Sequence, residues 1–399
     1  MELYTFKKEN ASAKNIVLDD MILTKDMPTA AGSKMLEGYM SLFDAEVVNK
    51  LTAAGYEIGG KAKVGELCID LLGETSYFGA NEREDGSLMT ASSEIVKKGE
   101  AIAAIGLDAN GTPRRAAALN GQVCIKPTYG TVSRFGTISI ACSGETVTVT
   151  ANNVENAKTV LGAIVGHDDK DGTSLPAEKC NAVTDGEAKA ERVAVASSLV
   201  KSADEATQKV IAGAIDTLKA KGVTVEEIDD SLLLAAKSAW NVLMSAELCN
   251  NVSRYEGVKY GYRTKNYTTI DELYTNSRTE AFGELLKNAI LFGSETLSTD
   301  NYMKMYDKGL RIRRVMAERL AEIFGEYDAL LMPACGKTVY TKADTEADKY
   351  ISYDENLYAA PASITGMPAV IAGGVQLVGK AFSENSLFEL AKMLEGDGK

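Results

Sequence analysis

The sequence predicts an α/β fold, and two observations support that prediction. Helical and strand patterns alternate along most of the 399 residues, and 45% hydrophobic with 25% charged residues is an ordinary globular composition. The chain has only 7 prolines and no Ser/Gly-rich linker, so no domain boundary stands out. We therefore expect one α/β domain over residues 1–399, with a helix-rich segment at about 231–326 inside it.

The alternation is clearest in two places. Residues 45–54 (AEVVNKLTAA) predict a helix that ends at glycine, and 55–60 (GYEIGG) follows as a short strand. Further along, 192–196 (RVAVA) predicts a buried strand, 203–221 has apolar residues at helical spacing, and 223–225 (VTV) predicts another strand. These three segments form a β-α-β unit.

The helix-rich segment ends in an amphipathic helix. Residues 302–324 carry charges on one face and apolar side chains on another, including Leu310, Met316 and Leu320. Residues 327–333 (YDALLMP) then predict a buried strand that proline closes.

The charge balance argues against one class of partner. The chain has 43 Lys+Arg against 56 Asp+Glu, a net charge of −13, and its acidic residues are dispersed. Binding to a phosphate backbone needs clustered Lys and Arg, so we expect no direct contact with nucleic acid. No run of ~18 apolar residues occurs and no signal peptide is evident, so we expect a cytoplasmic protein that does not bind membranes.

Nothing in the sequence points to a cofactor or a metal. The 6 cysteines are scattered without a C-x-x-C pair, which is typical of reduced, mostly buried thiols. We therefore expect neither a cofactor nor a metal site.

One stretch is more specific than the general α/β pattern. Residues 124–136 (CIKPTYGTVSRFG) resemble the amidase-signature family, and within it the A subunits of the glutamyl-tRNA(Gln)/aspartyl-tRNA(Asn) amidotransferases. Collinear matches run along nearly the whole chain, at 31–39 (AGSKMLEGY), 165–174 (VGHDDKDGTS), 253–263 (SRYEGVKYGYR), 277–283 (SRTEAFG) and 374–382 (GVQLVGKAF). The chain resembles a divergent, N-terminally shortened member, because the helices that open the family are not evident.

The resemblance implies a fold and a chemistry. The fold is an α/β/α sandwich with a mixed central sheet, and the reaction is amide hydrolysis by a Ser-Ser-Lys triad. One serine attacks the amide carbonyl, a second serine on a cis peptide passes its proton on, and a lysine accepts it. Backbone N–H groups before the nucleophile form the oxyanion hole. In the amidotransferases, ammonia from glutamine travels to a partner subunit that holds the tRNA.

The triad positions differ in this chain. Ungapped counting places the family lysine at Asp19, the cis serine at Leu88 (or at Ser87 with a slip of one residue) and the nucleophile at Thr112. An aspartate with an ordinary pKa near 3.9 is too weak a base to take a proton from a hydroxyl. Asp19 therefore opposes the family mechanism, and the alternative is a solvated carboxylate in a turn.

Around the reacting centre, some positions match the family and others differ. The resemblance implies that Ala109, Asn110 and Gly111 form the oxyanion loop, where Asn110 replaces a family glycine and can tolerate a positive φ at some cost. Tyr260 and Arg313 match the tyrosine and arginine that hold glutamine in the amidotransferases, while Asn356 replaces the aspartate.

The sequence leaves three partners open for Arg313. It can clamp the carboxylate of a ligand, form an i,i+4 pair on its own helix, or pair with Glu280 or Glu284.

Three functions remain open from the sequence. The chain is a catalytically impaired amidase relative that binds a small carboxylate or amide ligand or a protein partner, or it is a structural protein that takes the place of an A subunit. Alternatively it is a working amidase or glutaminase that supplies ammonia, using Thr112 and an unidentified base.

Overall fold

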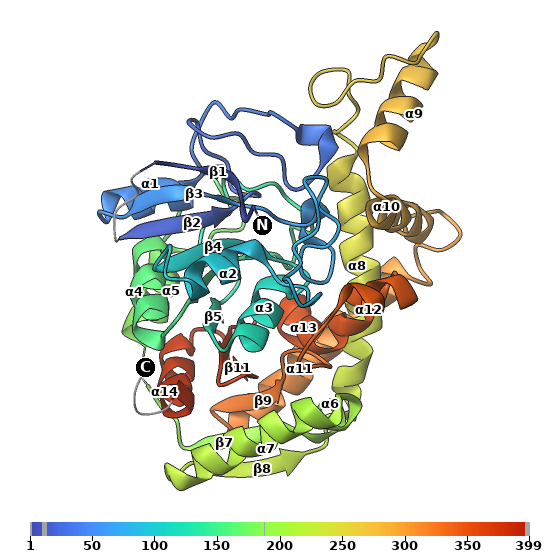
Figure 1. Ribbon diagram of the computed structural model, residues 1–399. Helices are drawn as coiled ribbons and strands as arrows, with labels where there is room; N and C mark the ends of the chain where they lie inside the picture. Colours follow the sequence, from blue (N-terminus) through green and yellow to red (C-terminus); the bar gives the residue numbers. More distant parts are fainter. Residues whose placement is uncertain (1, 10–13, 187, 396–399) are drawn as a thin grey trace.

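A computed structural model describes residues 2–9, 14–186 and 188–395 of the chain. Within these ranges an 11-stranded sheet runs through the molecule in the order β1-β3-β2-β4-β6-β5-β10-β11-β9-β7-β8 (Figure 1). The strands are β1 (Tyr4–Lys7), β2 (Asn15–Asp19), β3 (Glu57–Ala62), β4 (Ala103–Asp108), β5 (Val123–Lys126), β6 (Thr146–Ala151), β7 (Arg192–Ala196), β8 (Thr224–Ile228), β9 (Ala329–Pro333), β10 (Ala369–Ala372) and β11 (Val375–Gly379).

The sheet is mixed, which confirms the predicted fold class. Strand β2 runs parallel to β3 and β4, and β7 runs parallel to β8 and β9, while the remaining neighbours are antiparallel. The helices that surround it are α1 (Glu46–Ala53), α2 (Ala91–Lys97), α3 (Thr112–Asn120), α4 (Val154–Ile164), α5 (Ala177–Asp185), α6 (Ser197–Ser202), α7 (Glu205–Ala220), α8 (Ala235–Val252), α9 (Ile270–Ala281), α10 (Glu284–Thr296), α11 (Tyr306–Glu326), α12 (Lys342–Ala347), α13 (Ile351–Thr365) and α14 (Glu384–Glu395).

Alternating side chains on β4 show how helices cover both faces of the sheet. Ala104 packs in a cluster with Ile95 and Val96 of α2, whereas Ala103 and Ile105 belong to the main core, which includes residues of α4. Because successive strand residues point to opposite faces, α2 and α4 lie on opposite sides. Helix α3 contacts α2, so the segment that begins at Thr112 lies in the α2 layer.

Local sequence patterns place most of these elements within a few residues. The predicted β-α-β unit appears as β7, α7 and β8, and the strand expected at 327–333 appears as β9. The amphipathic helix expected at 302–324 begins later, at Tyr306, because a turn occupies the residues before it. The segment 231–326 holds α8 to α11, as its helix-rich pattern predicts.

Strand β1 forms the edge of the sheet next to β3. Tyr4 pairs with Ala62 and Lys7 with Gly60, in antiparallel register. Strand β3 therefore lies between β1 and β2, the strand that ends at Asp19. Glu2 and Tyr4 line a pocket together with residues of the loop after β2. No helix in the described ranges is long and apolar enough to cross a membrane.

Candidate active site

Asp19 lies at the carboxyl end of β2, between two parallel neighbours. Its side chain is buried, and Gly106 on β4 leaves the room for it, since a Cβ there would lie 2.5 Å from Asp19 Oδ2. Ser92, in the first turn of α2, hydrogen-bonds the carboxyl group. The expectation of a solvated turn carboxylate is wrong, because a central strand covered by α2 keeps this position out of water.

Thr112 is the first residue of α3. Gly111 has a φ of 77° and turns the chain from β4 into the helix, a conformation that glycine adopts without steric cost. Thr112 is 7% exposed, and its hydroxyl donates to the Asp70 carbonyl oxygen at 3.1 Å. The hydroxyl at the nucleophile position is thus engaged within the chain.

Asp19 and Thr112 line the same cavity. It measures about 20 Å³, and one water molecule needs roughly 10–15 Å³ of such space. The other polar residues around it are Lys63, Asp70, Asn81, Thr90 and Ser92. The structure therefore brings two of the three predicted triad positions together, around a space the size of a single water.

The loop 65–75 occupies the space beside the Thr112 hydroxyl. Leu67 and Cys68 have φ values of 52° and 51°, a region that non-glycine residues rarely adopt. Asp70 Oδ2 accepts from the backbone N–H and the hydroxyl of Thr75, both at 2.9 Å. A Cβ at Gly65 would lie 1.8 Å from Asp70 Oδ2, so glycine is required there. The loop is thus closely fitted around the Asp70 carboxyl group.

Comparison with known proteins identifies the family of this chain. A family model described as amidase matches residues 15–388. The A subunit of glutamyl-tRNA(Gln) amidotransferase from Latilactobacillus sakei is 35% identical over 398 residues, which cover 95% of this chain and 82% of that relative. The chain belongs to the amidase family.

Solved structures agree with the assignment. The A subunit of glutamyl-tRNA(Gln) amidotransferase from Thermotoga maritima has a TM-score of 0.80 at 25% identity, covering 98% of this chain and 86% of that chain. The 6-aminohexanoate cyclic dimer hydrolase, at 18% identity and a TM-score of 0.78, covers 96% of this chain and 84% of its own and shares the fold. The resemblance to the amidase-signature family is confirmed.

The cis-serine position lies outside the cavity of this amidase-family chain. Leu88 is 2% exposed, and its backbone N–H donates to the Tyr340 carbonyl oxygen at 2.8 Å. It belongs to an apolar cluster with Leu71, Leu72, Ala116, Cys335 and Tyr340. Ser87 is no substitute, because its hydroxyl donates to Asp85 at 2.6 Å. The hydroxyls that line the cavity from this segment belong to Thr90 and Ser92 instead.

The oxyanion loop is held by side chains. The expected positive φ at Asn110 is wrong, because Gly111 alone makes the turn. The Asn110 side chain donates to the carbonyl oxygens of Ile69 and Asp70 at 2.9 and 3.1 Å. The Gly111 N–H donates to Asp108 Oδ1 at 3.0 Å, so it is not free for an oxyanion. The Ala109 carbonyl accepts from the indole N–H of Trp240 at 2.9 Å.

Burial changes the acidity of Asp19. Removal from water raises the pKa of Asp19 to about 6, while the hydrogen bond from Ser92 lowers it. The ordinary value assumed from the sequence is therefore wrong, because the side chain is buried. At neutral pH the group is still largely ionised, as a carboxylate where the family has a lysine.

We expect Asp19→Asn to stabilise the protein at pH 8. Between the unfolded pKa of 3.8 and the folded value of about 6, the native state holds a proton that the unfolded chain has released. Stability therefore falls as pH rises through this window, by roughly 2–3 kcal/mol, and the asparagine variant escapes the loss. Urea unfolding at pH 8 and pH 4 measures the difference. An equal effect at both pH values would refute it, and the exposed Asp354→Asn is the matched control.

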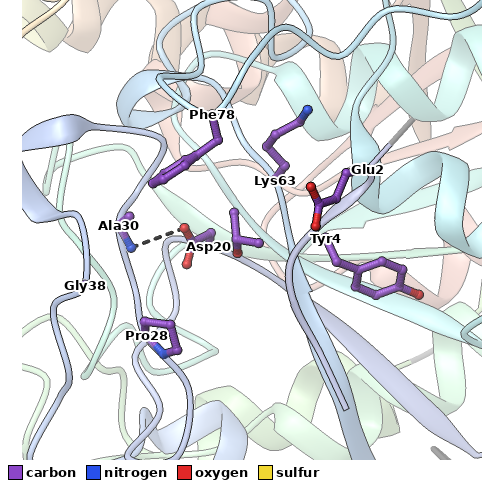
Figure 2. A pocket seen from close by; sticks show the side chains of 9 residues that line it. Glu2, Tyr4, Asp20, Pro28, Ala30, Gly38, Lys63 and Phe78 are labelled. Atoms are coloured by element: carbon purple, nitrogen blue, oxygen red, sulfur yellow. Dashed lines mark hydrogen bonds between the residues drawn. The ribbon is translucent and has the colours of Figure 1, made fainter. Parts of the chain in front are cut away.

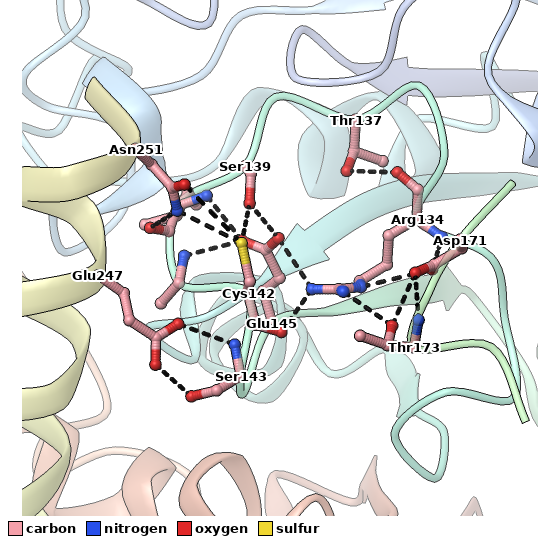
Figure 3. A network of polar contacts seen from close by, with 12 residues as sticks. Arg134, Thr137, Ser139, Cys142, Ser143, Glu145, Asp171, Thr173, Glu247 and Asn251 are labelled. Atoms are coloured by element: carbon pink, nitrogen blue, oxygen red, sulfur yellow. Dashed lines mark hydrogen bonds and ion pairs between the residues drawn. The ribbon is translucent and has the colours of Figure 1, made fainter. Parts of the chain in front are cut away.

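At the predicted substrate end, Arg313 is bound within its own chain. Its Nε donates to the Ile364 carbonyl at 2.6 Å, Nη1 donates to the Ser143 hydroxyl at 3.1 Å, and Nη2 donates to the Ser143 carbonyl. Ser143 is held in turn by Glu247, which accepts its backbone N–H at 2.8 Å and also its hydroxyl (Figure 3). The Arg313 side chain is thus satisfied without a ligand.

The alternative partners of Arg313 are occupied elsewhere. Glu280 accepts from Tyr262 and Thr264, and Glu284 pairs with Lys349 at 2.9 Å. The i,i+4 pairs on α11 are formed by the neighbouring residues Arg311 and Arg314. The expectations of an intrahelical pair and of an acidic partner are therefore both wrong, because Arg313 faces α13 and the 143 loop.

The other two substrate positions do not meet Arg313. Tyr260 is 38% exposed and packs against the rings of Tyr39 and Tyr255. Asn356 is buried and donates to Asn241 Oδ1 at 2.6 Å. Arg313 contacts α13 at Ile364, about 12 Å along the helix from Asn356. The described hydrogen bonds do not join these three residues into one clamp.

The other polar residues of the cavity were not predicted from the sequence, and two of them are titratable. Asp70 lies within the irregular loop 65–75, and no local pattern marks it as buried. Lys63 directly follows β3, whose Ala62 pairs with Asp19, so a lysine lies next to the family-lysine position on the neighbouring strand. Burial lowers the pKa of Lys63, and the nearby Glu2 raises it. The pairing of β2 with β3 would have identified Lys63, but a single sequence does not reveal which strands pair.

Proposed function

We propose that this amidase-family chain does not hydrolyse amides and acts by binding a ligand or a protein partner. The observation that carries the proposal is the cavity at Thr112, about 20 Å³ in volume. An amide has to approach the nucleophile with its carbonyl carbon, oxygen and nitrogen, and a space for one water does not admit it.

The charges around the cavity support the same conclusion. A carboxylate 5 Å from a developing oxyanion repels it by about 3 kcal/mol at an effective dielectric of 20, which slows the reaction by over a hundredfold. Asp19 brings such a charge to the cavity, and the Gly111 N–H is already bound to Asp108. Both features disfavour an oxyanion at this cavity.

A partner-binding role is supported by the relatives. The matched proteins are named as subunits of an amidotransferase, and the chain covers 82% of the Latilactobacillus sakei relative. A chain that keeps this fold without a working centre can occupy the place of such a subunit. Affinity purification of the tagged chain from its own cells tests this role.

One observation favours a second function, an active amidase. Asp19, with a pKa of about 6, and Lys63, whose pKa is lowered, line the same cavity as Thr112. A general base works best with a pKa near the operating pH. If the loop 65–75 opens, Thr112 would then have a candidate base that the sequence did not identify.

Ammonia release decides between the two functions. We expect the purified chain to release no more ammonia from glutamine, asparagine or simple amides than the Thr112→Ala variant does. Ammonia release that disappears in Thr112→Ala and falls in Lys63→Met or Asp19→Asn would overturn the proposal. Lys237→Met, at a partly exposed lysine that pairs with Asp354, controls for loss of a lysine as such.

A further inference from the structure

A larger pocket shares Lys63 with the small cavity. It measures about 190 Å³ and opens between strand β1, the loop after β2 and the end of β3 (Figure 2). For scale, an engineered cavity of about 150 Å³ takes up benzene, so the pocket suits a ligand of roughly six to eight non-hydrogen atoms. The triad positions Asp19, Leu88 and Thr112 and the substrate positions Tyr260, Arg313 and Asn356 do not line it.

Asp20 supplies an unpartnered acceptor to this pocket. The residue is 1% exposed, and its Oδ2 accepts from the Ala30 N–H at 3.1 Å. Its Oδ1 is buried and has no hydrogen-bond partner among the described residues. A buried carboxylate oxygen without a donor is costly to the folded state, and Asp20 is one of the residues that line the pocket.

The neighbouring side chains do not donate a hydrogen bond to Asp20 Oδ1 within the described residues. Burial raises the pKa of Asp20 above its ordinary value, and repulsion from Asp19 raises it further, while attraction to Lys61 and hydrogen bonding from the Ala30 N–H and the Thr5 side chain lower it. The Lys61 ammonium is bound to the Thr29 hydroxyl. The Thr5 hydroxyl donates to the Lys61 carbonyl at 3.4 Å. Lys61 therefore attracts Asp20 without donating to its free oxygen.

The opposite side of the pocket carries an unpartnered cation. Lys63 is 6% exposed, and its ammonium forms no hydrogen bond or ion pair with any residue in the described ranges. Glu2 attracts it through space, which raises the Lys63 pKa against the larger, opposite effect of burial. Figure 2 shows Lys63 and Glu2 on one side and Asp20 with Ala30 on the other.

We propose that this pocket binds a small zwitterion, with its primary ammonium on Asp20 and its carboxylate on Lys63. The Asp20 carboxylate and the Lys63 ammonium then each pair with a ligand group of opposite charge. Phe78 and Pro28 form an apolar part of the pocket wall, against which a short side chain can pack. The size favours free α-amino acids as small as glycine, alanine and serine. The proposal does not depend on whether the cavity at Thr112 hydrolyses amides, so either claim can fail alone.

Calorimetry and thermal shift on the full chain test the proposal. We expect alanine or serine to bind saturably and to raise the melting temperature. Ethylamine and propionate, which each lack one charged group, should bind about tenfold more weakly or worse. Asp20→Asn should weaken alanine binding by about tenfold or more. Lys63→Met should weaken alanine binding while leaving ethylamine binding unchanged.

Matched variants separate the pocket from general charge effects. Asp354→Asn and Lys237→Met remove the same groups from an exposed ion pair and should leave alanine binding unchanged. If Asp20→Asn does not fold, Lys63→Met and the ethylamine comparison decide the question on their own. The proposal is overturned if glycine, alanine and serine all fail to bind at millimolar concentration, or if their binding is insensitive to Lys63→Met, as it would be for a pocket that holds only water.

Discussion

Arg114→Met is expected to lower the free energy of unfolding by about 3–5 kcal/mol, because it leaves a buried charge without its partner. Arg114 and Asp108 are 1% and 0% exposed, and the guanidinium contacts both carboxylate oxygens, at 2.7 and 3.0 Å. The same arginine donates to the Gln376 and Ser363 side chains, which belong to β11 and α13. Its removal therefore unpairs Asp108 and loosens three elements at once.

Denaturant unfolding of Arg114→Met beside Arg314→Met measures this effect. Arg314 pairs with Glu318 on the exposed face of α11, where such a pair contributes about 0–1 kcal/mol. Burial alone would raise the pKa of Asp108, but the Arg114 charge and hydrogen bonds lower it below its ordinary value. The contribution of the pair is thus present above pH of about 4 and is lost as pH falls further, so the gap between the proteins narrows in acid. A loss no larger than that of Arg314→Met would contradict the account.

Trp240→Ala is the second large effect, with an expected loss of about 3–5 kcal/mol. The indole is fully buried and donates to the Ala109 carbonyl at 2.9 Å. Gly144 packs so closely that a Cβ there would lie 2.2 Å from the ring. The alanine variant leaves a large cavity and an unsatisfied carbonyl in the oxyanion loop.

Trp240→Phe separates the two contributions. It keeps most of the ring packing and removes the indole N–H, so we expect a smaller loss of about 1–3 kcal/mol from the unpaired Ala109 carbonyl. Equilibrium unfolding of both variants gives the comparison. If phenylalanine costs as much as alanine, the hydrogen bond rather than the packing holds α8 to the 109–111 loop.

Local patterns predict the elements of the fold but not their arrangement. Apolar spacing at 203–221 and the strands on either side correctly predict α7 between β7 and β8. The sheet order, in which β10 and β11 separate β5 from β9, depends on pairing between distant segments. A single sequence carries no record of such pairing, and the resemblance to the amidase-signature family supplied the sandwich.

The same limit applies to the site. Counting along the chain leads to Asp19 and Thr112, which line one cavity because Asp19 ends β2, Thr112 follows β4, and these two strands pair in the sheet. Leu88 does not reach that cavity, since burial of an apolar side chain against Tyr340 decides its position. The partners of Arg313 could not be predicted either, because Ser143 and Ile364 are distant in sequence and two of the three contacts use carbonyl oxygens.

The most direct test of the central claim is intact-mass measurement after incubation with a fluorophosphonate, a reagent that phosphonylates activated and accessible hydroxyl nucleophiles with loss of fluoride. The Thr112 hydroxyl is bound to the Asp70 carbonyl, in a cavity of about 20 Å³. We therefore predict that the protein keeps its unmodified mass, like the Thr112→Ala variant. A single adduct that maps to Thr112 and is missing in Thr112→Ala would contradict the account and show that the cavity opens to expose a working nucleophile.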